Sequence, residues 1–263
     1  MKGVEMGLWK KRLSDVIWLL CPFLVVIGIW QAVAAMEIFP PFLFPKATKV
    51  LVTFQEYIAS GELFEHILDS LIRLSLGFAV GFGLGFPLGI AMGSNRLIAR
   101  AFDPLVNFFQ AIPGLAWVPL AILWFGLGYK AVTFVIFTNV FFPVCFNTIT
   151  GVRGIPQVLI NSALTCGANY FQVVREILIF GALPSVVTGI RIGMGFGWRA
   201  LVGGEMIAAT SGLGFLIFDA RQFLKTDVII MGMATMGLMW LLMDRFILKP
   251  WELRTIERWG MAR

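Results

Sequence analysis

Six long apolar runs dominate this chain of 263 residues and limit what it can fold into. An α-helix rises 1.5 Å per residue, so about 20 apolar residues cross the roughly 30 Å hydrocarbon core of a bilayer. One soluble core cannot bury these runs, because 59% of the residues are hydrophobic and only 14% are charged. We therefore predict an all-α polytopic membrane protein with a transmembrane domain over residues 16–248. The six predicted transmembrane helices are Val16–Ala35, Leu71–Met92, Pro104–Leu127, Ala131–Ile149, Ser185–Ala209 and Val228–Leu248.

The basic residues flank these runs and predict an orientation. With both termini on the inner side, the inner segments carry 13 Lys and Arg residues and the outer segments carry 5. Lys and Arg concentrate in cytoplasmic loops, so residues 1–15 are predicted to be a cytoplasmic N-terminal segment and 249–263 a cytoplasmic basic tail. The same distribution argues against nucleic-acid binding, despite the net charge of +6. A cleaved signal peptide is the alternative for the first run, which is longer than the usual apolar core of such a peptide.

Two of the runs contain glycines at intervals of four. Gly77 to Gly93 form one strip, and Gly189, Gly193 and Gly197 form another. Small residues at this spacing let a second helix approach closely, which drives helix association in lipid. We expect the second and fifth spans to pack against each other.

The third run is interrupted by Pro113-Gly114 and again by Pro119. Broken helices at membrane depth occur where the freed backbone faces protein or a water-filled cavity. Pro113, Gly114 and Trp117 are therefore candidate residues of a translocation pathway. The aromatic residues of this run allow two interpretations, packing or lipid contact on one hand and a substrate cage on the other; they are Phe108, Phe109, Trp117, Trp124 and Phe125.

Two charged residues in the fifth run, Arg199 and Glu205, are further pathway candidates. An unpaired charge at the centre of a bilayer costs at least about 2.5–3.5 kcal/mol, so each should face protein or water. Arg199 either pairs with a carboxylate of a neighbouring helix or attracts an anionic substrate. Arg191 and Arg73 lie nearer the two interfaces, where we expect their side chains to snorkel towards water.

The segment 151–184 has the features of a docking element. Pro156 suits the first turn of a short helix, and Gly167 suits its left-handed end. Asn169 can cap a second helix, with Gln172 completing a capping box. We expect Phe171, Val174 and Leu178 to form the apolar face of that second helix.

This segment also carries a family resemblance. The run Ser162-Ala163-x3-Gly167-Ala168, followed by Leu183-Pro184, resembles the EAA loop of inner-membrane permeases of binding-protein-dependent ABC importers. Asn161 stands where the motif has Glu, and Phe180 stands where many members have Pro.

Two further motifs resemble the nitrate, sulfonate, taurine and bicarbonate branch of that family. One is PLVNFFQAIPGLAWVPLAILWFGLG, in which Pro113-Gly114 replaces the usual Pro-Pro. The other runs from Gly189-x-Arg191-Ile192-Gly193 to Glu205-Met206-Ile207-Ala208-Ala209, and Arg191 and Glu205 match its pattern. Arg199 does not belong to it, and we expect it to reflect this protein's own substrate.

The resemblance implies a type I ABC importer permease fold in a bacterial inner membrane. It implies a homodimer of permeases, two cytoplasmic ATPases that bind ATP and Mg, and a periplasmic or lipid-anchored solute-binding protein. It also implies that the coupling loop docks on the ATPase through Asn161, Ser162, Ala163, Gly167, Ala168, Leu183 and Pro184. The expected cargo is a small, anionic solute resembling nitrate, a sulfonate, taurine or bicarbonate.

We expect no catalytic or metal-binding residue in the chain itself. It contains no G-x-x-x-x-G-K-[ST] phosphate loop, so ATP hydrolysis is expected in a separate chain. One His and three Cys leave little material for a metal site or a disulfide framework, and His66 is expected to be a surface residue. The alternative class is a self-sufficient secondary transporter or channel, for which we find no inverted repeat.

Overall fold

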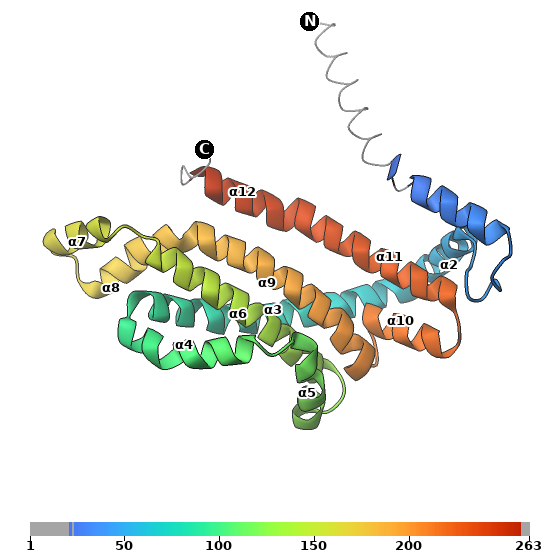
Figure 1. The fold of residues 1–263 in the computed structure, drawn as a ribbon, viewed down its shortest axis with the longest axis horizontal. Coiled ribbons are helices and arrows are strands. Elements are labelled where there is room, and N and C mark those ends of the chain that lie inside the picture. Colours follow the sequence, from blue (N-terminus) through green and yellow to red (C-terminus); the bar gives the residue numbers. More distant parts are fainter. Residues whose placement is uncertain (1–20, 23, 259–263) are drawn as a thin grey trace, which may run out of the picture.

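The computed structural model describes residues 21–22 and 24–258, and this part of the chain contains helices but no β-strand (Figure 1). The N-terminal segment 1–15, the first part of the predicted span Val16–Ala35 and the last five residues of the tail lie outside the described residues. The described part of that span includes an apolar helix, Leu24–Ala35.

The helices follow one another with short connections. They are α2 (Ala47–Ala59), α3 (Glu62–Ser94), α4 (Arg96–Gln110), a 3-10 turn (Gly114–Trp117), α5 (Val118–Phe125), α6 (Tyr129–Arg153), α7 (Gln157–Thr165), α8 (Tyr170–Gln172), a π-helical segment (Val173–Leu178), α9 (Ile179–Ala208), α10 (Leu213–Gln222), α11 (Thr226–Met243), a second π-helical segment (Asp244–Leu248) and α12 (Lys249–Arg258).

Four continuous helices in the described part are long and apolar enough to cross a membrane: Glu62–Ser94, Tyr129–Arg153, Tyr170–Ala208 and Thr226–Thr255. They confirm the second, fourth, fifth and sixth predicted spans as apolar helices. The third predicted span is a pair of helices, Arg96–Gln110 and Gly114–Phe125, bent by 92° at the break, and counts as a fifth span if the pair crosses together.

The broken span begins earlier than predicted. The third span was predicted to start at Pro104, but α4 starts at Arg96, so Arg96 and Arg100 lie in its first turns. Asn95 explains this start, because its side-chain oxygen accepts hydrogen bonds from the N–H groups of Leu97, at 2.8 Å, and Ile98.

α6 lies between α3 and α9 and forms the centre of the bundle (Figure 1). The α3 glycine strip faces α6: a Cβ on Gly81 would lie 2.8 Å from Val140, and one on Gly89 would lie 2.6 Å from Thr148. The α9 strip also faces α6, since a Cβ on Gly189 would lie 2.6 Å from Asn147. The second and fifth spans do meet, since a Cβ on Gly197 would lie 3.7 Å from Leu74 of α3, but both strips pack mainly on α6. Side chains of α6 fill the space that each strip leaves, which a second glycine strip could not do.

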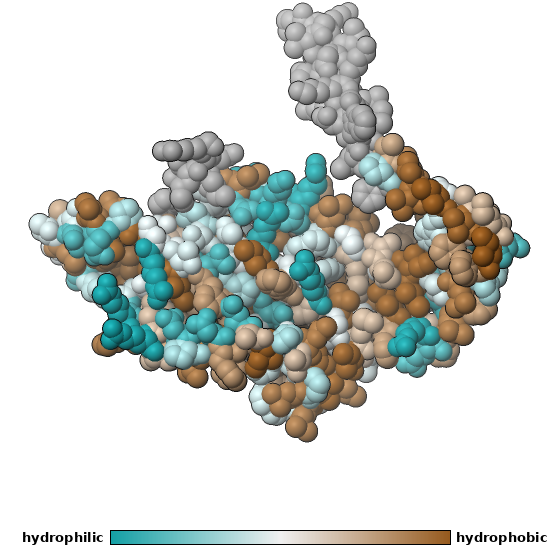
Figure 2. Space-filling view, viewed as in Figure 1, coloured by the Kyte–Doolittle hydropathy of each residue, from teal (hydrophilic) through white to brown (hydrophobic). Residues whose placement is uncertain are grey.

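The molecule is elongated, with different elements at its two ends. α7 and α8 lie at one end and α2 and α10 at the other, while α3, α6, α9 and α11 run between them (Figure 1). α5 projects from the side of the bundle, and its surface is hydrophobic (Figure 2), with Leu123 80% exposed.

Candidate functional site

The break in the third span is an elbow, residues 111–117, seated on two other helices. Pro113 precedes the 3-10 turn, and Pro119 lies in the first turn of α5. Gly114 lies directly against the side chain of Asn139 on α6, and Leu115 packs on Gly203 of α9. A Cβ on either glycine would collide with these neighbours, so the elbow can approach both helices only because glycine stands at these positions.

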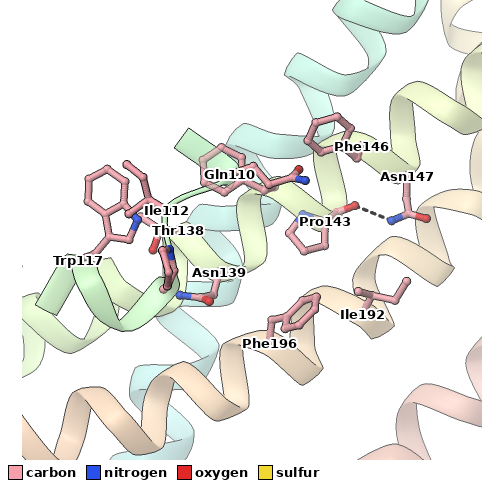
Figure 3. Close-up of a pocket in the computed structure, with 13 residues that line it drawn as sticks. Gln110, Ile112, Trp117, Thr138, Asn139, Pro143, Phe146, Asn147, Ile192 and Phe196 are labelled. Atoms are coloured by element: carbon pink, nitrogen blue, oxygen red, sulfur yellow. Dashed lines mark hydrogen bonds between the residues drawn. The ribbon is translucent and has the colours of Figure 1, made fainter. Parts of the chain in front are cut away.

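A cavity of about 510 Å³ lies beside this elbow (Figure 3). The α4–α5 break, α6 and α9 all contribute to its wall. The lining residues are Gln110, Ile112, Pro113, Gly114, Trp117, Thr138, Asn139, Phe142, Pro143, Phe146, Asn147, Ile192 and Phe196. The lining includes three of the predicted pathway residues, Pro113, Gly114 and Trp117. It does not include Arg199 or Glu205.

The polar groups of the cavity are mainly side-chain amides, which the sequence analysis missed. Asn139 Nδ2 donates to the carbonyl of Val135 and Asn147 Nδ2 donates to that of Pro143, each at 2.8 Å (Figure 3 shows the second bond). Each amide keeps its oxygen and one N–H for other partners. Unsatisfied polar groups are costly in lipid, so this wall suits water or a polar solute. The signal in the sequence was the occurrence of uncharged amides within long apolar runs.

Arg199 lies close to this cavity, on the exposed surface of α9. Its guanidinium carbon is 5.7 Å from the ring centroid of Phe196, which lines the cavity. It forms no ion pair with any residue in the described part of the chain. The expected brace between Arg199 and a neighbouring carboxylate is therefore not found among these residues.

Glu205 is instead paired with Arg73 of α3. Arg73 Nη1 lies 2.6 Å from Glu205 Oε1, and the two side chains are 1% and 0% exposed. The prediction that Arg73 snorkels to the outer interface is wrong. Its partner is 132 positions away in the sequence, so the local sequence of α3 gave no sign of it.

Arg191 is also part of an ion-pair network. It donates to Asp244 Oδ1 at 2.8 Å and to Glu252 Oε2 at 2.6 Å. These contacts join α9 to the continuous helix that includes α11 and α12. The Arg191 side chain is 34% exposed, and the sequence gave no sign of the two carboxylates that a neighbouring helix supplies to it.

The docking segment forms two short helices at one end of the molecule (Figure 1). Pro156 precedes α7, and Gly167 has the left-handed φ of +86°. Asn169 and Gln172 form the predicted capping box, with hydrogen bonds of 2.9 and 2.8 Å. The predictions for Gly167 and for the capping box are confirmed, whereas Pro156 directly precedes the first turn of α7 and does not lie in it.

The surface of this segment is partly different from the expected one. Of the three residues predicted on the buried face, Leu178 is buried, Val174 is half-buried and Phe171 is 70% exposed, while Val173 is buried in addition. The π-helical segment explains the difference, because its wider turn changes which positions face the bundle. Asn161, Ser162 and Gly167 are exposed, Ala163 and Ala168 are half-buried, and Leu183 and Pro184 lie within α9.

The family model described as "Binding-protein-dependent transport system inner membrane component" matches residues 85–247. The chain belongs to this family. This permease is 34% identical to the taurine transport system permease protein TauC of Escherichia coli over 239 residues, which is 87% of each chain. It is 32% identical to the bicarbonate transport system permease protein CmpB of Synechococcus elongatus, over 94% of this chain and 93% of CmpB.

A solved structure of the MetNI methionine ABC transporter in an inward-facing conformation has the same fold. The TM-score is 0.65 at 18% identity, over 75% of this chain and 97% of the matched chain. The fold class is therefore confirmed as an all-α permease of the ABC importer type. The permease is a translocation subunit and a transport component rather than an enzyme, and its family works with ATPase and solute-binding partners. The part that the structure describes has no group of three His, Cys, Asp or Glu residues that could hold a metal ion.

Proposed function

We propose that the amide-lined cavity is a section of the solute pathway and that the solute is a small anion of the sulfonate or bicarbonate kind. Arg199 is the observation that carries this proposal. It is an exposed cation within the span Tyr170–Ala208, it lies beside the cavity, and it pairs with no described carboxylate. An unpaired charge at this depth is stable only against water, protein or a counter-ion. The solutes in the names of TauC and CmpB both carry an anionic group.

A second permease copy would cover the face that carries Arg199 and the cavity mouth. Gln110 on α4 and Arg199 on α9 are exposed polar residues of membrane-spanning elements. Lipid is a poor partner for both. We infer a homodimer in which these faces meet around a shared, hydrated pathway.

The coupling partner would dock on α7 and α8. Two cytoplasmic ATPases that bind ATP and Mg are proposed to contact Asn161, Ser162, Ala163, Gly167 and Ala168. The helix from Tyr170 to Ala208 is continuous and includes Leu183 and Pro184. Movement imposed at α8 would therefore shift Phe196 and Arg199 beside the cavity.

We propose that the two ends of the molecule lie on opposite sides of a bacterial inner membrane. The α7–α8 end and both termini would be cytoplasmic, as the distribution of Lys and Arg predicts. The end formed by α2 and α10 would face a periplasmic or lipid-anchored solute-binding protein.

The test is solute uptake into proteoliposomes that contain the permease, its ATPase and its solute-binding protein. We expect ATP-dependent uptake of an alkanesulfonate, taurine or bicarbonate. The Arg199→Gln variant should lose about tenfold or more of this uptake, whereas Arg199→Lys should keep most of it. Equal uptake by Arg199→Gln and the parent protein would contradict an anion-attracting role. Uptake without the ATPase would instead support the self-sufficient transporter.

A further inference from the structure

The N-terminus of α10 is capped by side chains from two other helices. The N–H groups of Gly212–Gly214 donate in order to His66 Nδ1, Ser70 Oγ and Glu205 Oε2, at 3.0, 2.9 and 2.9 Å. α10 has no side-chain cap of its own, because its N-cap residue is glycine. The first N–H groups of a helix have no partner within it. The outer ends of α3 and α9 therefore supply the partners that α10 lacks.

These caps belong to a buried ionic cluster that we call the Arg73–Glu205 cluster, formed by Ser70, Arg73, Tyr129, Glu205 and Ser211. The Glu205 carboxylate accepts from Ser70 Oγ at 2.9 Å, from Arg73 Nη1 at 2.6 Å and from the N–H of Gly214. Arg73 also donates to the carbonyl of Ser211 at 2.7 Å and to its hydroxyl at 2.6 Å. Every neighbour that Glu205 contacts in this network is a donor, so the site specifically fits a carboxylate.

Tyr129 connects α6 to the same cluster. Its ring centroid lies 4.2 Å from the Arg73 guanidinium carbon, and its hydroxyl donates to Asp69 Oδ1 at 2.8 Å. Asp69 in turn lies 3.8 Å from Arg73 Nη2. The cluster thus joins α3, α6, α9 and α10 at one end of the bundle.

Gly212, which precedes α10, and Gly214, in its first turn, fit closely around the cluster. Gly212 has a φ of +102°, and a Cβ there would collide with the Glu205 carboxylate. A Cβ on Gly214 would lie 2.6 Å from the carbonyl of Val202. At both positions the backbone lies so close to its neighbours that a residue with a Cβ would collide with them.

The elbow before α5 is attached in a different way. In the described part of the chain, the hydrogen bonds of residues 111–125 stay within α4, the 3-10 turn and α5. The first bond to another helix comes after α5, where the N–H of Gly128 donates to the carbonyl of Ala208 on α9 at 2.6 Å. The elbow contacts the bundle through packing, as Leu115 does on Gly203 and as Trp117 does on Phe134. Packed surfaces can slide, whereas separation of the cluster would leave buried charges and N–H groups without partners.

We propose that Arg73 and Glu205 are positioning residues that hold the outer ends of α3, α9 and α10 as one rigid unit throughout transport. The outer opening of the cavity then comes from movement of the elbow and α5 against this unit. This inference rests on the cavity being the pathway, as proposed above.

Distances between spin labels in the assembled importer test the proposal. Four exposed positions carry the labels in pairs, in a background without the native cysteines: Phe64 on α3, Ile207 on α9, Arg221 on α10 and Leu123 on α5. Labelled permease is diluted with unlabelled permease so that distances within one copy dominate. Between the nucleotide-free and ATP-trapped states, distances among the first three positions should stay constant, and distances to Leu123 should shift by several ångströms. Equal shifts among all four positions would overturn the rigid unit.

Two variants test the residues themselves. Glu205→Gln replaces a carboxylate oxygen by an amide N–H₂, which is itself a donor and faces other donors. The distributions of the distances to the label at Arg221 on α10 should therefore broaden, and uptake should fall about tenfold or more. If this variant does not fold, the double variant Arg73→Gln/Glu205→Gln removes both buried charges. It should still show broad distance distributions to the α10 label that change with the nucleotide state.

Glu65→Gln is the matched control, because Glu65 is exposed on α3 and forms no ion pair with the described residues. Narrow distances and normal uptake in the double variant would overturn the proposal. Since uptake of anions by the parent protein is measured separately, a wrong pathway assignment is distinguishable from a wrong rigid unit.

Discussion

Arg73 and Arg199 are both arginines within membrane-spanning helices, but their surroundings differ. Arg73 is buried and bonded to Glu205 and Ser211, while Arg199 is exposed beside Phe196 and pairs with no described carboxylate. The bilayer makes a charge costly in both places. The protein meets this cost with internal partners at Arg73, whereas Arg199 depends on something outside the described chain. The comparison separates residues that maintain the structure from residues that are available to a solute.

The largest expected effect is at the buried partner of Arg73. Glu205→Ala leaves Arg73 as a buried, uncompensated charge, so we expect the free energy of unfolding to fall by about 3–5 kcal/mol. Thermal unfolding of the purified permease in detergent measures this loss. Glu65→Ala, at an exposed position of α3, the helix that carries Arg73, should have little effect. Similar stability of the two variants would remove the distinction between Arg73 and Arg199.

The next effect concerns the helices that carry the cluster. A Cβ on Gly85 would lie 2.7 Å from the backbone carbonyl of Phe141, which cannot move aside as a side-chain end can. Gly85→Ala should therefore lower the free energy of unfolding by about 1–3 kcal/mol. Gly83→Ala is the matched control on the same helix, since nothing lies within 4 Å of its Cβ position. If both variants unfold at the same temperature, the close approach of α3 and α6 is not what stabilises the pair.

A smaller effect on stability, with a large effect on coupling, is expected at Gly167. Its φ of +86° disfavours a β-branched residue, although its Cβ position is open. Gly167→Val should cost about 1–2 kcal/mol locally and should abolish the stimulation of ATP hydrolysis by the solute-loaded binding protein. Asn tolerates this backbone conformation, so Gly167→Asn should retain most of the stimulation. Normal stimulation in Gly167→Val would argue against docking of the ATPase on this segment.

The smallest effect on stability is expected at Arg199 itself. Because Arg199 forms no ion pair with the described residues, Arg199→Gln should change the free energy of unfolding by less than about 0.5 kcal/mol. The same variant should lose anion uptake, as described above. A loss of stability as large as that of Glu205→Ala would show that Arg199 is also a structural charge.

Much of the fold was predictable because local sequence specifies it. Long apolar runs set the spans, Pro113-Gly114 set the break, and Gly167 and Asn169 set the ends of the docking helices. These features depend on hydrophobicity and on backbone preferences within a few residues. The family motifs added the type of fold and the transport role.

The site was predicted only in part. Pro113, Gly114 and Trp117 line the cavity as predicted. The sequence analysis did not predict that Arg73 and Glu205 pair with each other or that Asn139 forms part of the cavity wall. The glycine strips were correctly identified as packing surfaces, but α6 was not predicted as the main partner of both. Such pairings join residues far apart in the sequence, and one sequence contains no direct record of which faces meet.

The sequence by itself determined that this chain crosses a membrane several times and where its third span breaks. It also determined that one short helix ends at Gly167 and that the next begins at Asn169. Hydropathy and local backbone conformation are properties of neighbouring residues, so they can be read along the chain. Only the tertiary structure decided that α6 separates the two glycine strips, that Glu205 is neutralised by Arg73 and that Arg199 is left exposed. Those outcomes depend on which helices meet in space, and the cost of a charge in a bilayer depends on the partner that it meets there.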